Sequence, residues 1–173
     1  MTSPRLSRAR ARGDDGTADD GTAIVEFVWL GMLLLVPLVY VILFAFAVQR
    51  AAFAATESTR TAARAFVTTP NGDVAVAAAR SNESARLTLD DHGVPASDRT
   101  IVAPVCRPAG AKDSTGETAP CFTPGSAVVV EVDIDVQMPV LPAFGIRGAA
   151  IRVHGIHREV FDKYTDYAPP VTP

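Results

Sequence analysis

The chain lacks the short motifs that carry most enzymatic chemistry. Its 173 residues contain no Gly-x-Ser-x-Gly, no His-Glu-x-x-His and no glycine-rich phosphate loop. Nucleophile-elbow hydrolases, zinc proteases and nucleotide-phosphate sites therefore have no support. The sequence indicates a protein that is not an enzyme, with no catalytic residues, no cofactor and no small-molecule substrate.

The chain also lacks a large excess of charge of either sign. The chain has 16 Lys and Arg residues against 19 Asp and Glu residues, for a formal net charge of -3. No basic patch of the kind that follows a phosphate backbone is present. We therefore expect no nucleic-acid partner.

A long stretch without charged residues lies near the N-terminus. The 22 residues 27–48 contain no Asp, Glu, Lys or Arg. As a helix this run would be about 33 Å long, enough to cross a hydrocarbon core of about 30 Å. Its large apolar residues cover every face, whereas a helix buried in a soluble core usually keeps a polar face. We predict a transmembrane helix and keep the buried core helix as the alternative.

Basic residues flank this run on its N-terminal side. Arg5, Arg8, Arg10 and Arg12 crowd the short arm, and such residues resist translocation. We expect a single-pass cell-membrane protein with its N-terminus in the cytoplasm and its C-terminal domain outside.

Three fates are open for this N-terminus: an uncleaved anchor, a secretory signal, or a leader cut before the apolar run. Ala45-Phe46-Ala47 supplies the small-x-small pattern of secretory cleavage, but the apolar run is longer than a signal requires. Pro37 is tolerable in a spanning helix.

The stretch Asp20-Gly21-Thr22-Ala23-Ile24-Val25-Glu26-Phe27 favours the third fate. A glycine precedes the run, Glu26 is the fifth residue from Thr22, and Phe27 follows the acid. This spacing resembles the processing site of the type IV pilin superfamily, in its Flp and TadE-like branch. The resemblance implies that a membrane prepilin peptidase cuts between Gly21 and Thr22.

A near-copy of this stretch lies upstream. Asp15-Gly16-Thr17-Ala18 repeats the residues around Gly21, but the residue five beyond Gly16 is Gly21 rather than an acid. Gly21 alone fits the pattern.

Three further features, Pro37 within the apolar run, a helix that continues past it and a small C-terminal region of alternating strands, resemble TadE and TadG proteins, the pseudopilin-like minor components of tight-adherence pilus systems. From these features together with the apolar run and the flanking arginines, we expect a basic cytoplasmic leader over 1–21, a transmembrane helix over 22–49, an exported domain over 50–168 and a disordered tail over 169–173. The resemblance implies that the leader is cleaved. It also implies membrane lipid, the peptidase, other pilus or pseudopilin subunits and an inner-membrane assembly platform as partners. Because about 120 residues would be exported, we expect a minor or assembly component rather than a bulk fibre subunit.

Glu26 has a physical role in this reading. A charge inside a bilayer costs on the order of 2.5–3.5 kcal/mol at the helix centre, so the acid needs a partner or a place near the interface. Cleavage after Gly21 would leave the ammonium of Thr22 four residues away, on the same helix face, or within reach of the acid of a neighbouring subunit. The alternative is that Glu26 only favours the positive end of the helix dipole.

Two helices are expected before the sheet. Residues 49–67 lack Gly and Pro and are rich in alanine, so the first helix should continue beyond the membrane. Its helically spaced small and apolar residues are Ala52, Ala55, Thr59, Ala62, Ala63 and Phe66. Pro70-Asn71-Gly72 should end it, and Asp73 should cap a second helix running to about Leu89.

Strands should follow. Residues 128–136 alternate from Val130 onward, which predicts Val130, Val132, Ile134 and Val136 inward and Glu131, Asp133 and Asp135 outward. A second strand over 149–161 changes parity, and we expect a bulge at Gly155. A short strand over 100–106 and a connection over 139–148 complete a small antiparallel sheet, so the predicted fold class is α+β.

Metal binding has weak support. Glu131, Asp133 and Asp135 supply oxygen ligands suited to calcium, but we expect a solvated face on which Arg152 and His154 pair with them. His154 and His157 form no zinc site because no third ligand is evident. No metal is predicted.

Cys106 and Cys121 are the two cysteines. Outside the cytoplasm they should form a disulfide, worth roughly 3 kcal/mol for a loop of about 15 residues. Two free thiols are the alternative.

Overall fold

The computed structural model describes residues 16–108, 110–111, 116–138 and 150–162, with backbone alone for 16–22. It divides into two compact units, Met1–Val41 and Ile42–Pro173, which are treated separately below. The basic arm before residue 16, the predicted connection over 139–148 and the predicted tail over 169–173 lie outside the described residues.

Helix α1, Gly16–Val67, contributes to both units. In the first unit its described side chains, from Ala23 onward, are all exposed. The helix is long and apolar enough to cross a membrane, and no part of its most apolar window is buried. Pro37 lies inside the helix, as the sequence predicted.

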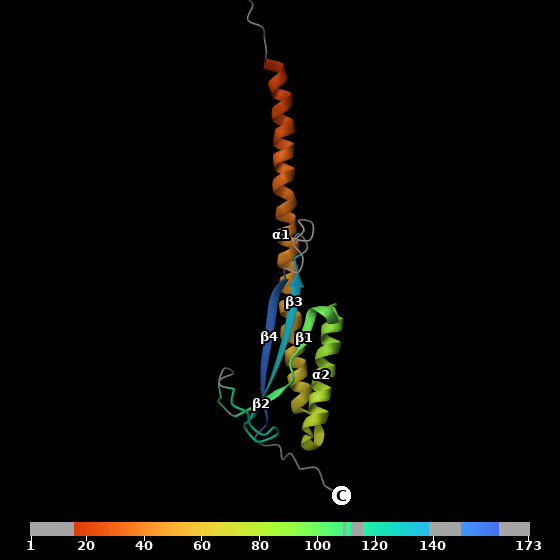
Figure 1. Cartoon of the computed structure of the whole chain (residues 1–173), viewed down its shortest axis with the longest axis vertical. Helices are drawn as coiled ribbons and strands as arrows, with labels where there is room; N and C mark the ends of the chain where they lie inside the picture. Colours follow the sequence, from red (N-terminus) through yellow and green to blue (C-terminus); the bar gives the residue numbers. More distant parts are fainter. Residues whose placement is uncertain (1–15, 109, 112–115, 139–149, 163–173) are drawn as a thin grey trace, which may run out of the picture. The chain divides into compact units, whose positions relative to one another are not determined.

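In the second unit α1 runs beside the sheet (Figure 1) and buries one stripe of mostly small residues. The stripe recurs every three or four residues, the period of a helix packed along one side. Its members are Ala51, Ala54, Ala55, Ser58, Thr59, Ala62, Ala63 and Phe66. The prediction that Ala52 belongs to it is wrong, because Ala52 is exposed and Ala51 and Ala54 take the buried positions.

The second helix, α2, spans Val74–Asp91 and follows the short helix η1, Pro70–Gly72. The Asp73 carboxylate accepts hydrogen bonds from the backbone N–H groups of Ala75 (2.9 Å) and Val76 (3.1 Å). The predicted N-cap is therefore confirmed. At the other end Gly93 adopts a positive φ of 69°, which suits a helix terminus.

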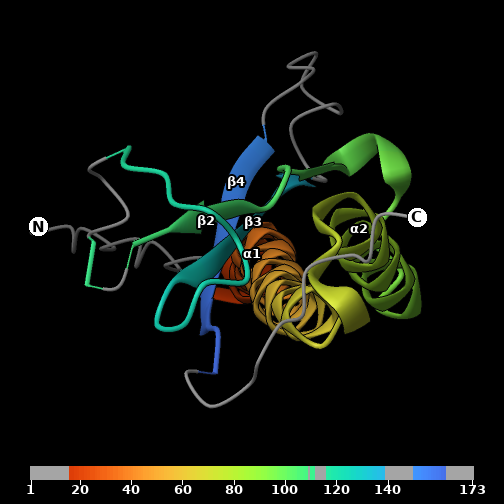
Figure 2. The same cartoon turned by 90° about the horizontal axis from the view of Figure 1, so that it is seen from below.

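Four strands form one antiparallel sheet. They are β1 (Arg99–Ile101), β2 (Val105–Arg107), β3 (Ala127–Gln137) and β4 (Ala150–Val160). Strand β3 pairs with all three others, and β4 runs along its full length. The helices α1 and α2 lie side by side against one face of the sheet (Figure 2). The predicted α+β fold, with a long N-terminal helix, a second helix and a small antiparallel sheet, is confirmed.

The single strand predicted over 100–106 is two strands. β1 pairs with residues 132–134 of β3, and β2 pairs with residues 127–129. Between them the N–H of Val102 still donates to the carbonyl of Glu131 at 3.0 Å. Pro104 then interrupts the ladder because proline has no N–H to donate.

The bulge predicted at Gly155 is wrong. The register of β3 and β4 is regular from Ala127↔Val160 to Gln137↔Ala150, and Gly155 stands opposite Val132. Without a bulge, Ile156 and Val160 fall on the outer face, where they are 43% and 59% exposed. Gly155 is instead buried at the contact with α1.

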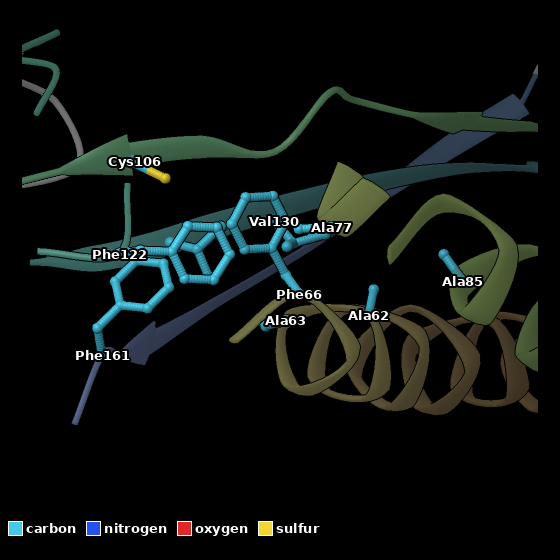
Figure 3. Packing of buried hydrophobic residues seen from close by; sticks show 10 residues of the cluster. Ala62, Ala63, Phe66, Ala77, Ala85, Cys106, Phe122, Val130 and Phe161 are labelled. Atoms are coloured by element: carbon cyan, nitrogen blue, oxygen red, sulfur yellow. The ribbon is translucent and has the colours of Figure 1, made fainter. Parts of the chain in front are cut away.

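Aromatic residues close the core at the end near the disulfide (Figure 3). The Phe66 ring stacks on Phe122 with a centroid distance of 5.5 Å, and Phe161 meets Phe122 at 4.9 Å. Val128 and Val130 of β3 pack in the same cluster. The opposite end of the core is aliphatic, with Leu89, Val132 and Ile134 against Ala51 and Ala55.

Candidate functional site

The predicted processing bond, between Gly21 and Thr22, lies within α1. Helix α1 begins at Gly16, before this bond. The backbone on both sides of the bond is thus helical, and a peptidase that reads an extended chain would have to unwind it. The cleavage itself stays a prediction.

Glu26 and Phe27 are both exposed on α1. Among the described residues no cation or hydrogen-bond donor pairs with the Glu26 carboxylate. Because residues four apart on a helix are neighbours, positions 22 and 26 share a face of α1. This spacing allows the ammonium that cleavage would free at residue 22 to pair with the Glu26 carboxylate.

Two of the three outward carboxylates of β3, Asp133 and Asp135, pair across the sheet with His154 and Arg152, as the sequence predicted. Arg152 Nε donates to Asp135 Oδ1 at 2.9 Å. The hydrogen bond from Arg152 holds the pKa of the Asp135 carboxyl below its ordinary value of 3.8, and the same bond raises the pKa of Arg152. These groups form an ion pair on the surface rather than an open cation site.

The histidines of β4 point to opposite faces. His154 Nδ1 lies 2.8 Å from Asp133 Oδ1 on the outer face, whereas His157 Nε2 lies 3.1 Å from Glu159 Oε2 on the other. Within the described segments no group of three His, Cys, Asp or Glu side chains is arranged to hold a metal ion. The two histidines share no ligand set.

The disulfide between Cys106 and Cys121 is present, with a Cα–Cα distance of 5.3 Å. It joins β2 to the residue before Phe122. Phe122 has a positive φ of 59°, unusual for a bulky residue, and its ring lies between those of Phe66 and Phe161. The bridge therefore holds a strained residue at the aromatic end of the core.

The sequence did not predict the contact between Arg158 and the segment that follows β2. Its guanidinium donates to the carbonyl of Pro108 at 2.8 Å and also to the carbonyl of Ala111. These bonds bring the segment after β2 over the outer face of the sheet. Arg158 looks like an ordinary surface residue in the sequence, so no local signal could have revealed this role.

A pocket of about 220 Å³ lies at the aliphatic end of the second unit. It is formed by α1 near residues 47–51, by the segment 92–98 after α2, and by the end of β3 at 134–137. The Arg50 guanidinium, at its wall, donates to the carbonyl of His92 at 3.3 Å. The sequence analysis did not find this pocket, although Arg50 is the first charge after the uncharged run.

The chain matches no protein-family model, no curated protein and no solved structure. The function is therefore inferred from the sequence and structure of this chain.

Proposed function

We propose that this protein is a TadE-like minor pseudopilin or assembly component of a tight-adherence pilus system. It is held in the membrane by α1, is processed after Gly21 and has no catalytic role. The proposal rests on the resemblance of the segment around Gly21 and Glu26. One observation carries it furthest: α1 supplies both the exposed apolar run and the buried stripe of the exported domain.

A shared helix suits an assembly subunit for a physical reason. The apolar run can store the subunit in the bilayer and pack against other apolar helices, while the same helix fixes the soluble domain through Ala55, Ala62 and Phe66. The exposed acid at Glu26 is then the one charged side chain in residues 22–49 and can register helices within lipid by pairing with a Thr22 ammonium. The proposed partners are the prepilin peptidase, other pseudopilin subunits and the assembly platform.

The decisive experiment measures the mature N-terminus. The full chain is coexpressed with a prepilin peptidase, and the intact mass and N-terminal sequence of the membrane fraction are determined. We expect a start at Thr22. Gly21→Ile should block cleavage, because a branched side chain replaces the small residue before the cut.

The near-copy provides a matched control. Gly16→Ile places the same side chain after the same acidic residue and before the same Thr-Ala pair, but it should leave cleavage at Thr22 intact. A wild-type chain that keeps its arginine-bearing arm would refute the processing step.

A second candidate is an uncleaved single-pass envelope protein whose outer domain binds a ligand or surface unrelated to pili. It is favoured by the helical backbone across the Gly21–Thr22 bond, because an unwound segment would be easier to cut. Retention of the arm together with normal membrane insertion would select this candidate. A start at Val48 would select secretory cleavage instead.

A further inference from the structure

The pocket at the aliphatic end of the second unit has an apolar wall and a charged rim. Its apolar lining comes from Ala47, Ala51, Val94, Pro95, Ile134 and Val136. Ala47 belongs to the uncharged run itself, and Arg50 is the first ionic residue beyond it. In a chain anchored by that run, the pocket opens within one helical turn of the end of the apolar segment.

Both signs of charge line this pocket. Arg50 has five N–H donors in its guanidinium, and the bond to His92 uses one of them. Asp98 is half-buried, also lines the pocket and accepts a bond from the Ser97 hydroxyl at 3.0 Å. Asp135 also lines the pocket, but it is already paired with Arg152.

We propose that this pocket binds the headgroup of a phosphatidylethanolamine molecule from the bilayer that surrounds α1. The phosphate of the lipid bonds to Arg50, its ammonium group donates to Asp98, and the adjoining glycerol and acyl carbons lie against Ala47 and Val136. The inference rests on the membrane anchor of the proposed function, and it does not depend on processing at Gly21 or on pilus assembly.

The chemistry of the rim selects among lipids. An anionic lipid would bring its phosphate next to Arg50, but it has no ammonium group to offset its negative charge. That charge would be repelled by the carboxylates of Asp98 and Asp135. Phosphatidylcholine has the same charges as phosphatidylethanolamine, but its quaternary ammonium has no N–H to donate to a carboxylate. A primary ammonium satisfies both walls, since charge-assisted hydrogen bonds are the stronger ones.

The test uses the full chain in nanodiscs of phosphatidylcholine doped with either phosphatidylethanolamine or phosphatidylglycerol. Native mass spectrometry then counts the lipids that stay bound when the protein is released from the disc. We expect the wild type to retain phosphatidylethanolamine in preference to both other lipids. Arg50→Gln and Asp98→Asn should each lower its retention by about tenfold, the factor expected for one lost charge-assisted hydrogen bond.

Two further variants separate the pocket from general effects. Ala47→Trp fills the pocket from an exposed position and should displace the lipid while both charged residues, Arg50 and Asp98, are kept. Arg64→Gln removes an exposed arginine from the same helix, away from the pocket, and should leave lipid retention unchanged. Circular dichroism and an intact Cys106–Cys121 bridge confirm that each variant is folded.

The outcomes distinguish the lipid site from the anchor. A chain that enters the discs but retains no phosphatidylethanolamine, prefers phosphatidylglycerol, or behaves identically in the Arg50 and Arg64 variants overturns the lipid site alone. A chain that does not enter discs of any composition overturns the anchor and the lipid site with it.

Discussion

Gly155 of β4 and Ala55 of α1 pack with no room for a side chain between strand and helix. A methyl group at position 155 would lie 2.8 Å from both the Cβ and the carbonyl oxygen of Ala55. Real carbon atoms do not approach so closely, and the backbone oxygen cannot rotate away. This contact brings the sheet against α1 at the centre of the second unit.

Gly155→Ala should therefore destabilise the helix-and-sheet domain of the second unit by about 1–3 kcal/mol, the usual cost of forcing a methylene into a packed core. The measurement is thermal unfolding of the full chain in nanodiscs, followed by circular dichroism. Gly31→Ala is the matched control, because nothing lies within 4 Å of a Cβ at that position. An unchanged Tm for Gly155→Ala would contradict the close contact.

Phe66 and Phe53 provide a pair of phenylalanines on one helix with opposite surroundings. Phe66 is 1% exposed within the aromatic cluster, whereas Phe53 is 72% exposed. We expect Phe66→Ala to cost about 3–5 kcal/mol, as for other buried aromatic truncations, and Phe53→Ala to cost under about 0.5 kcal/mol. Equal shifts in Tm for the two variants would show that the cluster does not support the domain.

Removing the disulfide should also lower stability. The bridge closes a loop with a sequence separation of 15, so the double variant Cys106→Ala, Cys121→Ala should lose about 3 kcal/mol. Adding reductant should bring the wild type to the Tm of this variant and leave the variant itself unchanged. Recovery of both thiols by alkylation of the unreduced native protein would refute the bridge.

The pair of Asp135 and Arg152 predicts a pH dependence. The pKa of Asp135 is below 3.8 in the folded protein, so the pair stabilises the fold above the unfolded pKa. That contribution is lost as the pH falls through the lower, folded pKa. Arg152→Gln should raise the pKa of Asp135 toward 3.8, as measured by carboxyl chemical shifts in an NMR titration.

The control for this titration is Arg60→Gln, which removes an exposed arginine from α1 and should leave the pKa of Asp135 unchanged. Because both partners of the pair are on the surface, raised salt should weaken the effect. A titration curve of Asp135 that is the same in wild type and Arg152→Gln would contradict the ion pair as the cause.

Glu26→Ala tests the proposed registry of helices. The change removes a charge from an apolar helix, so membrane insertion should be intact or improved, while pilus-dependent adhesion should fall. Glu26→Gln keeps the shape without the charge and should show the same defect. Normal adhesion in both variants would argue against an electrostatic role for this acid.

The sequence predicted correctly those helices and strands whose residue pattern fits only one structure. Alternation in residues 128–136 fixed the faces of β3, and Asp73 before an alanine-rich run fixed the start of α2. The glycine in β4 had two readings, because a strand glycine marks either a bulge or a close approach of another backbone. Choosing between them requires knowing that Ala55 lies opposite.

The candidate site was less predictable than the fold. The spacing of Gly21, Thr22 and Glu26 is local and can be read directly. The pocket beside Arg50 is built from three segments that are distant in the sequence, and the bonds from Arg158 to the segment after β2 depend on tertiary packing. No local pattern records such contacts.

The bridge between Cys106 and Cys121 also bears on how the domain withstands proteolysis. A protease that nicks the chain once between these cysteines produces two polypeptides that remain one covalent molecule. The piece carrying β3 and β4 then stays attached to the piece carrying α1, and the nicked domain can keep its strands in register until the bond is reduced.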